Sequence, residues 1–206
     1  MAFQGAAAGS FAAGLGTGLS LIVAIGAQNA FVLKQGLLRR HVFAVCLFCA
    51  LSDAALIAAG VAGAGALASR APWFLSAMRW GGAAFLIWYG LRSARAAWRG
   101  GEALAPEGAV PPSLAATLAT IAALTWLNPH VWLDTVVLLG AVSAQSPDRV
   151  AFAVGAMTGS VLFFFSLGYG ARLLAPVFAR PAAWRVLDAA VALVMWAIAA
   201  TLILGG

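Results

Sequence analysis

The sequence has few charged residues and little of the chemistry on which metal sites depend. Only 9% of its 206 residues are charged, whereas a soluble domain carries roughly 25%. It contains two histidines and two cysteines, and no HxxxH motif, second CxxC pair or carboxylate cluster accompanies them. We therefore expect no bound metal, no cofactor and no enzymatic activity.

The charge that is present is mainly basic, with a formal net charge of +6. Most of it is arginine between apolar segments, which is typical of cytoplasmic loops rather than of nucleic-acid binding. The sequence is 64% hydrophobic and has a mean hydropathy of +0.98. Residues 1–33 carry no charged side chain and are too long for the apolar part of a signal peptide. This composition predicts a multi-pass protein of the lipid bilayer.

Charged residues and turn residues divide the apolar sequence into six segments. They run approximately over residues 10–33, 41–63, 72–91, 113–140, 149–172 and 182–204. Each has about 20 residues or more and can cross a hydrocarbon core of roughly 30 Å. The expected fold is an all-α membrane protein with six transmembrane helices in a single domain, residues 1–206.

The connectors between these segments predict an inverted repeat. The first connector, with Lys34, Arg39 and Arg40, is basic, as are the third and the fifth. Basic connectors are typically cytoplasmic, which places both termini on the outer, periplasmic side. A polar linker over about 96–112 separates one repeat, about 1–95, from a second, about 113–206. Three spans per half is an odd number, so the second half would be inserted upside down.

Two short polar interruptions lie about one hundred residues apart, at 26–33 and 127–134. Side-chain amides inside hydrocarbon are unfavourable unless a partner satisfies them, and Pro129 removes a backbone donor. We therefore expect the first and fourth helices to be broken. A broken helix exposes backbone N–H groups, which can bind a carboxylate, and backbone C=O groups, which can bind an ammonium. The predicted substrate-binding residues at the breaks are Gln28, Asn29, Asn128 and Pro129.

Asp53 and Asp134 are the candidate proton-coupling residues, and both are candidates for substrate binding. Asp53 lies twelve residues into the second segment, about 18 Å deep and near the midplane, where a carboxylate costs about 2.5–3.5 kcal/mol. Asp53 would bind a cationic substrate or a proton, form a static pair with Arg79, or cap a helix break. Gln28 aligns with Asn128, which brings Lys34 into register with Asp134. Lys34 would then face the cytoplasm and Asp134 the outside, unless the break moves Asp134 inward beside a cavity.

Arg79 and Trp132 complete the predicted substrate site. Arg79 lies seven residues after Pro72. It would reach the outer interface, anchor a substrate carboxylate or pair with an aspartate. Trp132 and Trp126 flank the second break and would shape a pocket by cation–π contact.

Small residues form two further patterns in the apolar segments. Cys46 and Cys49 have CxxC spacing, which is compatible with a redox pair or with two small buried residues of a helix. Two pairs of glycines, Gly14 with Gly18 and Gly155 with Gly159, have the small-xxx-small spacing of close helix contacts.

The ordered set of motifs resembles the bacterial L-lysine/L-arginine exporter family, the LysE and ArgO type of the LysE superfamily. The resemblance covers essentially the whole chain. It rests on the run at 26–33, Gln35-Gly36, Leu51-Ser52-Asp53, Arg79-Trp80-Gly81-Gly82, Thr125-Trp126-Leu127-Asn128-Pro129 and Leu133-Asp134. The family usually carries proline where this chain has Ala27, so the first break would rest on Gly26 instead.

The resemblance implies a secondary exporter of basic amino acids in the bacterial inner membrane, driven by proton antiport and alternating access. Moving one positive charge outward costs about 2.3 kcal/mol per 100 mV, and an entering proton would offset this. Asp53 would alternate between a proton and the substrate cation. The expected partners are an amino acid, protons and lipid, with no nucleic acid; a homodimer is compatible with six helices.

Three other functions stay open at this point. The chain could export neutral amino acids or metal ions, as other members of the superfamily do. It could be a membrane thiol oxidoreductase that uses Cys46 and Cys49. It could also be a structural subunit of a larger complex, although two polar breaks and a midplane acid favour transport.

Overall fold

The computed structural model describes residues 2–23, 26–63, 72–99 and 112–204. Every regular element in these ranges is helical, and no strand occurs among them, which confirms the all-α prediction. The elements are α1 (Ala2–Ile22), α2 (Ala27–Leu38), α3 (Val42–Val61), α5 (Pro72–Arg99), α6 (Leu114–Trp126), α7 (Pro129–Trp132), the π-helical η2 (Leu133–Leu138), α8 (Leu139–Ser143), α9 (Arg149–Gly170), the 3₁₀ segments η3 (Ala171–Leu174) and η4 (Val177–Ala179), and α10 (Pro181–Leu204).

Four described helices are long and apolar enough to cross a membrane. They cover Gly5–Ile22, Val42–Val61, Arg149–Leu174 and Pro181–Leu204. A fifth span is obtained if the pair Leu114–Trp126 and Pro129–Ser143, which is bent by 62°, is counted as one. Helix α5 has 28 residues, includes four arginines and is not among them. The described part of the chain is therefore all-helical, with four or five candidate spans.

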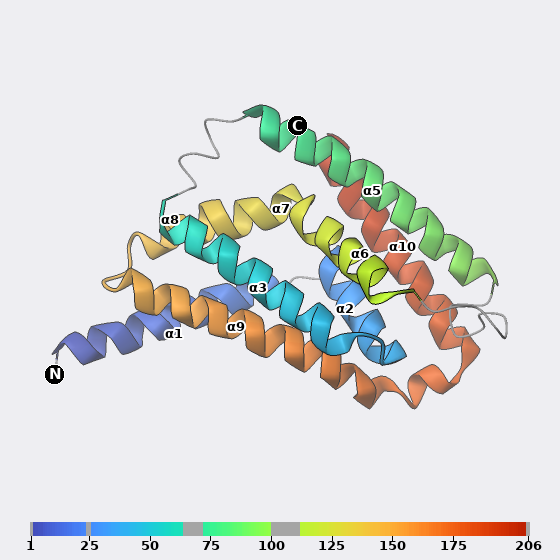
Figure 1. The fold of residues 1–206 in the computed structure, drawn as a ribbon, viewed down its shortest axis with the longest axis horizontal. Coiled ribbons are helices and arrows are strands. Elements are labelled where there is room, and N and C mark those ends of the chain that lie inside the picture. The colour runs from blue at the N-terminus through green and yellow to red at the C-terminus, as the bar shows by residue number, and fades with distance from the viewer. Residues whose placement is uncertain (1, 24–25, 64–71, 100–111, 205–206) are drawn as a thin grey trace.

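The helices pack as two long pairs around a central helix (Figure 1). Helix α1 runs along α9, and α5 runs along α10. Helix α3 lies against α9 on one side and against α6, η2 and α8 on the other. The largest apolar cluster joins α2, α3, α5, α6, α9 and α10, with Ile121, Phe164 and Met195 almost fully buried in it. This arrangement surrounds the two short helix breaks with packed helices.

The contact between α1 and α9 depends on glycine. A Cβ atom at Gly14 would come within 3 Å of the backbone of Phe152, and one at Gly155 within 3 Å of the backbone of Phe11. Gly18 and Gly159 lie at the same interface, against Ala156 and Leu15 respectively. Both small-xxx-small motifs therefore meet in a single helix pair, where small residues let the two backbones approach.

Two expected boundaries differ in the structure. Helix α5 continues to Arg99, so residues 96–99 of the predicted linker are helical, while 100–111 lie outside the described residues. The placement of Lys34 in the first basic connector is wrong. Helix α2 continues to Leu38, and Lys34 is 2% exposed. A carboxylate on α10, described below, balances its charge, so the helix does not need to end before it.

Candidate functional site

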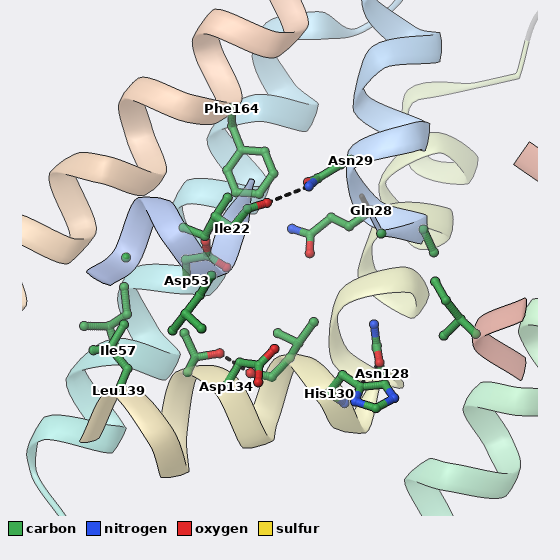
Figure 2. A pocket seen from close by; sticks show the side chains of 17 residues that line it. Ile22, Gln28, Asn29, Asp53, Ile57, Asn128, His130, Asp134, Leu139 and Phe164 are labelled. Carbon is green, nitrogen blue, oxygen red and sulfur yellow. Dashed lines mark hydrogen bonds between the residues drawn. The ribbon is translucent and has the colours of Figure 1, made fainter. Parts of the chain in front are cut away.

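The two helix breaks meet at one cavity of about 240 Å³ (Figure 2). Gly26 with the start of α2 and the segment from Asn128 through η2 form two opposite sides (Figure 2), and α1, α3, α8, α9 and α10 contribute the rest. Five residues that the sequence predicts for the site line this cavity: Gln28, Asn29, Asp53, Asn128 and Asp134. Apolar side chains from five elements form most of the wall: Ile22, Ile57, Leu139, Phe164 and Ile198. The cavity thus combines a few polar groups with an apolar lining, as small-molecule sites do.

At the first break, the side chain of Asn29 satisfies the end of α1. Its Nδ2 donates to the carbonyl oxygen of Ile22 over 2.7 Å, one of the carbonyls that a helix C-terminus leaves without an intrahelical partner. Helix α2 then begins at Ala27, after an extended Gly26 with φ −123°. Asn29 therefore joins the two halves of the broken helix.

Gln28 has a different role at the same break. Its side chain is only 8% exposed, and its Nε2 has no hydrogen-bond partner among the described residues. Figure 2 shows this amide reaching from α2 into the cavity, on the side that faces Asp53 and Asp134. A buried donor without an acceptor costs about 1–3 kcal/mol. A bound ligand with an oxygen acceptor would recover that free energy.

At the second break, Asn128 and Pro129 start a new helix. The Oδ1 of Asn128 accepts a hydrogen bond from the backbone N–H of His130 over 3.1 Å. Pro129 is buried and occupies the first helical position, where its missing N–H is not needed. After one turn of α7 the chain widens into the π-helix η2, which carries Asp134. Short π-helical segments are frequent at functional sites.

Two carboxylates reach the cavity from different helices. Asp53 on α3 is 4% exposed and accepts a hydrogen bond from the hydroxyl of Ser160 on α9 over 2.7 Å. Asp134 on η2 is more exposed, and His130 precedes it by one turn on the same side of the cavity. The sequence left open whether Asp134 is interfacial or moves inward; in the structure it lines the cavity. The site therefore offers negative charge to a cation and an amide donor to an anion.

Three predicted residues lie outside the cavity lining. The guanidinium of Arg79 donates to the backbone carbonyls of Leu202 and Ile203 at the end of α10, the second over 2.8 Å. Pro129 and Trp132 remain at the second break, where the Nε1 of Trp132 donates to the carbonyl of Trp126 over 3.1 Å. The rings of these two tryptophans meet edge to face at 5.7 Å. Pro129 and Trp132 therefore determine the local structure of the second break, and neither forms part of the cavity wall.

Comparison with known proteins identifies the family. The model of the LysE type translocator family matches residues 19–206. The chain belongs to the LysE-type translocator family. This confirms the resemblance that the sequence motifs indicate.

Named relatives of this LysE-type translocator match over nearly their full length. A putative amino-acid transporter of Mycobacterium tuberculosis is 48% identical over 182 residues, which cover 88% of this chain and 90% of the relative. The arginine exporter protein ArgO of Yersinia enterocolitica is 44% identical over 191 residues, covering 92% and 93%. ArgO of Salmonella enteritidis is 42% identical over 189 residues, covering 90% and 89%. No solved structure matches the chain.

The two cysteines of the translocator are completely buried in α3. Both are free thiols, and the Sγ of Cys46 donates to the carbonyl of Phe164 over 3.2 Å. Thiol chemistry requires a thiolate that is reachable by its reaction partner. The observed positions favour the interpretation that these are small packing residues.

Two features of the translocator were missed from the sequence. Ser160, the partner of Asp53, is a single serine in an apolar helix, and nothing in the sequence distinguishes it. Asp188 on α10 forms a buried ion pair with Lys34 on α2, with 2.5 Å between Nζ and Oδ1. The signal that marks Asp53, a carboxylate inside an apolar segment, applies equally to Asp188 and would have found it.

Proposed function

We propose that this LysE-type translocator exports basic amino acids, most simply L-arginine or L-lysine, from the cytoplasm. The observation that carries the proposal is the cavity between the two helix breaks, which places Asp53, Asp134 and the unpartnered amide of Gln28 around one space. The names of the ArgO relatives, which describe arginine exporters, point to the same class of substrate.

The cavity provides a complementary group for each charge of a basic amino acid. The guanidinium or ammonium of the side chain pairs with Asp53 or Asp134, because a buried carboxylate needs a cationic partner. The α-carboxylate accepts from the Nε2 of Gln28 and lies near the N-terminus of α2, where unpaired backbone N–H groups and the helix dipole favour an anion. The apolar wall holds the alkyl part of the substrate.

Transport is proposed to exchange the substrate for a proton. A carboxylate binds a proton or an organic cation, and binding one opposes binding the other. Asp53 is suited to this exchange because it is buried beside the cavity and the hydroxyl of Ser160 stabilises its charged form. Asp134 is the second candidate. Proton movement into the cell would compensate for the roughly 2.3 kcal/mol per 100 mV that export of one positive charge requires.

The proposed architecture has six spans arranged as two inverted repeats. Helices α1 with α2, α3 and α5 form one half; α6 to α8, α9 and α10 form the other. The packing supports this, because α3 lies against α9 and α5 against α10, as equivalent helices related by a twofold axis should. Each broken helix also packs on the second helix of the opposite half. We propose that both termini are periplasmic and that the basic connectors are cytoplasmic.

Flux measurements in inside-out membrane vesicles test the proposal. Labelled arginine and lysine should accumulate in vesicles that hold the translocator when the interior is acidic, and collapse of the pH gradient should stop accumulation. Threonine serves as the neutral substrate, and vesicles without the protein as the blank. Accumulation of threonine alone would refute the basic-substrate assignment. We also propose that the protein forms a homodimer, which light scattering of the detergent-purified protein would test.

A further inference from the structure

A pair of opposite charges lies inside the helical bundle, away from the cavity. The ammonium of Lys34 on α2 and the carboxylate of Asp188 on α10 are 2.5 Å apart. Their residues are 2% and 0% exposed. Removing two charges from water costs several kcal/mol each, and a buried ion pair is often no more stabilising than apolar residues of the same size. Ionisable groups at such places in membrane proteins commonly belong to a substrate path.

The pair lies on the side of the cavity that faces the basic connectors. Lys34 follows Gln28 by six residues, about 9 Å along α2 toward Arg39. Asp188 precedes the cavity residue Ile198 by ten residues, about 15 Å along α10. A separate pocket of about 50 Å³ reaches Lys34 from this side, and Arg40 also lines it. The pair therefore separates the cavity from the side on which the proposed substrate enters.

The chemistry of Lys34 matches that of the proposed substrates. L-lysine has the same ammonium on a four-carbon chain, and L-arginine carries a guanidinium of the same charge. We propose that Asp188 is a second substrate-cation site, on the cytoplasmic side of the cavity, which Lys34 occupies as a tethered substitute when no substrate is bound there. An arriving basic amino acid exchanges with Lys34 at Asp188. This inference rests on the proposed function.

The exchange has a structural consequence for α2. Lys34 links α2 to α10, and α2 also carries Gln28 and Asn29 at the cavity. When the substrate cation replaces Lys34, the charge of Asp188 stays compensated while α2 loses this link. Substrate arrival and release of the helix at the first break are thereby coupled.

The test uses purified protein and n-butylammonium, which is the lysine side chain without its α-carbon groups. The unfolding temperature is measured with butylammonium chloride or sodium chloride. In Lys34→Ala, butylammonium should raise the unfolding temperature at concentrations at least tenfold lower than in the wild type, because the tethered competitor is gone. The double variant Lys34→Ala/Asp188→Asn should lose this gain. Arg40→Ala, which removes a cation from the same pocket, should behave as the wild type does.

The cation site at Asp188 and the proposed export of basic amino acids can be refuted independently of each other. The gain in Lys34→Ala should persist when Asp53→Asn is added, since it depends on Asp188 and not on the main cavity. If Lys34→Ala unfolds on extraction, butylammonium chloride in the extraction buffer should yield folded protein where sodium chloride does not. Three results would overturn the inference: equal responses of Lys34→Ala and wild type, a gain that survives Asp188→Asn, or a wild type whose unfolding temperature butylammonium leaves unchanged at every concentration, since a purely structural ion pair would not exchange. Lack of recovery during extraction would equally overturn it.

Discussion

Replacement of Asp53 by asparagine is the most direct perturbation of the proposed mechanism. Asparagine has nearly the same shape, and its Oδ1 still accepts a hydrogen bond from Ser160, so the packing of α3 against α9 is retained. The substitution removes the negative charge and the ability to bind a proton. We expect stability to change by about 1 kcal/mol or less, since a buried charge is removed while the hydrogen bond remains.

The expected loss of substrate affinity follows from the position of Asp53. Asp53 is 4% exposed and lies beside a largely apolar cavity. A hydrogen bond to a charged partner contributes about 1.5–3 kcal/mol in such surroundings. At 1.4 kcal/mol for each factor of ten, the Kd for arginine should rise by about 10- to 100-fold. Transport against a gradient should disappear entirely, because the variant has no proton to exchange at this position.

Two assays separate these effects. Isothermal titration of the purified variant with arginine measures the loss of affinity. Reconstituted vesicles measure uptake driven by a pH gradient and, separately, arginine–arginine exchange without a gradient. Asp148→Asn is the matched control: Asp148 caps α9 by accepting from the N–H of Ala151 over 2.9 Å, a role that asparagine can also fill, and it lies outside the cavity. The control should bind and transport as the wild type does.

One result would refute the role of Asp53. If Asp53→Asn accumulates arginine in response to a pH gradient at the wild-type rate, this carboxylate neither couples protons nor binds the cation. Asp134 would then be the remaining carboxylate of the cavity. If Asp53→Asn loses gradient-driven uptake but still exchanges arginine for arginine, Asp53 serves proton coupling and is not needed to bind the substrate.

The remaining predictions concern the helix breaks, the helix packing and the thiols. Ala27→Pro should fold and transport normally, because Ala27 is the first residue of α2 and proline suits that position. The free energy of unfolding should rise by about 0.4–1 kcal/mol. A drop in unfolding temperature would show that this backbone N–H is needed. Gly14→Ala should lower the unfolding temperature, because its Cβ would overlap the backbone of α9. Gly16→Ala is the control and should leave the unfolding temperature unchanged, since nothing lies within 4 Å of the new atom. Similar effects of the two substitutions would contradict the observed packing. Replacement of both Cys46 and Cys49 by alanine should leave vesicle transport above half of the wild-type rate, whereas complete loss of transport in folded protein would reopen a thiol role.

Much of the site could be predicted because polar residues are rare in this chain. Each polar side chain in an apolar segment requires a partner or a ligand, so Gln28, Asn29, Asn128 and the aspartates stand out without any structure. The cavity brings five of the predicted residues together. The same reasoning could not assign their separate roles. Asn29 caps α1 and Asn128 caps α7, whereas Gln28 points into the cavity without a partner.

The predictions for Lys34 and Arg79 show the limit of one-dimensional reasoning. A lysine beside two arginines at the end of an apolar segment is expected in a loop, yet Lys34 is inside α2 because Asp188 faces it from a helix 154 residues later. The pair with Asp53 that was considered for Arg79 is not formed; the guanidinium instead binds carbonyl groups at the end of α10. Both outcomes depend on long-range contacts that the spacing of residues does not encode.

The ordered motifs of the sequence carried its resemblance to the LysE type. The sequence by itself also predicted an all-helical membrane protein with two polar breaks and with carboxylates inside apolar segments. These properties follow from composition and local chemistry, since hydrocarbon excludes unpaired charge and amide groups wherever they occur along the chain. Only the tertiary structure decided which polar groups meet. It brought the two breaks to one cavity, gave Asp53 the hydroxyl of Ser160 and joined Lys34 to Asp188. Such pairings are set by how distant helices pack, through contacts like the glycine interface of α1 and α9.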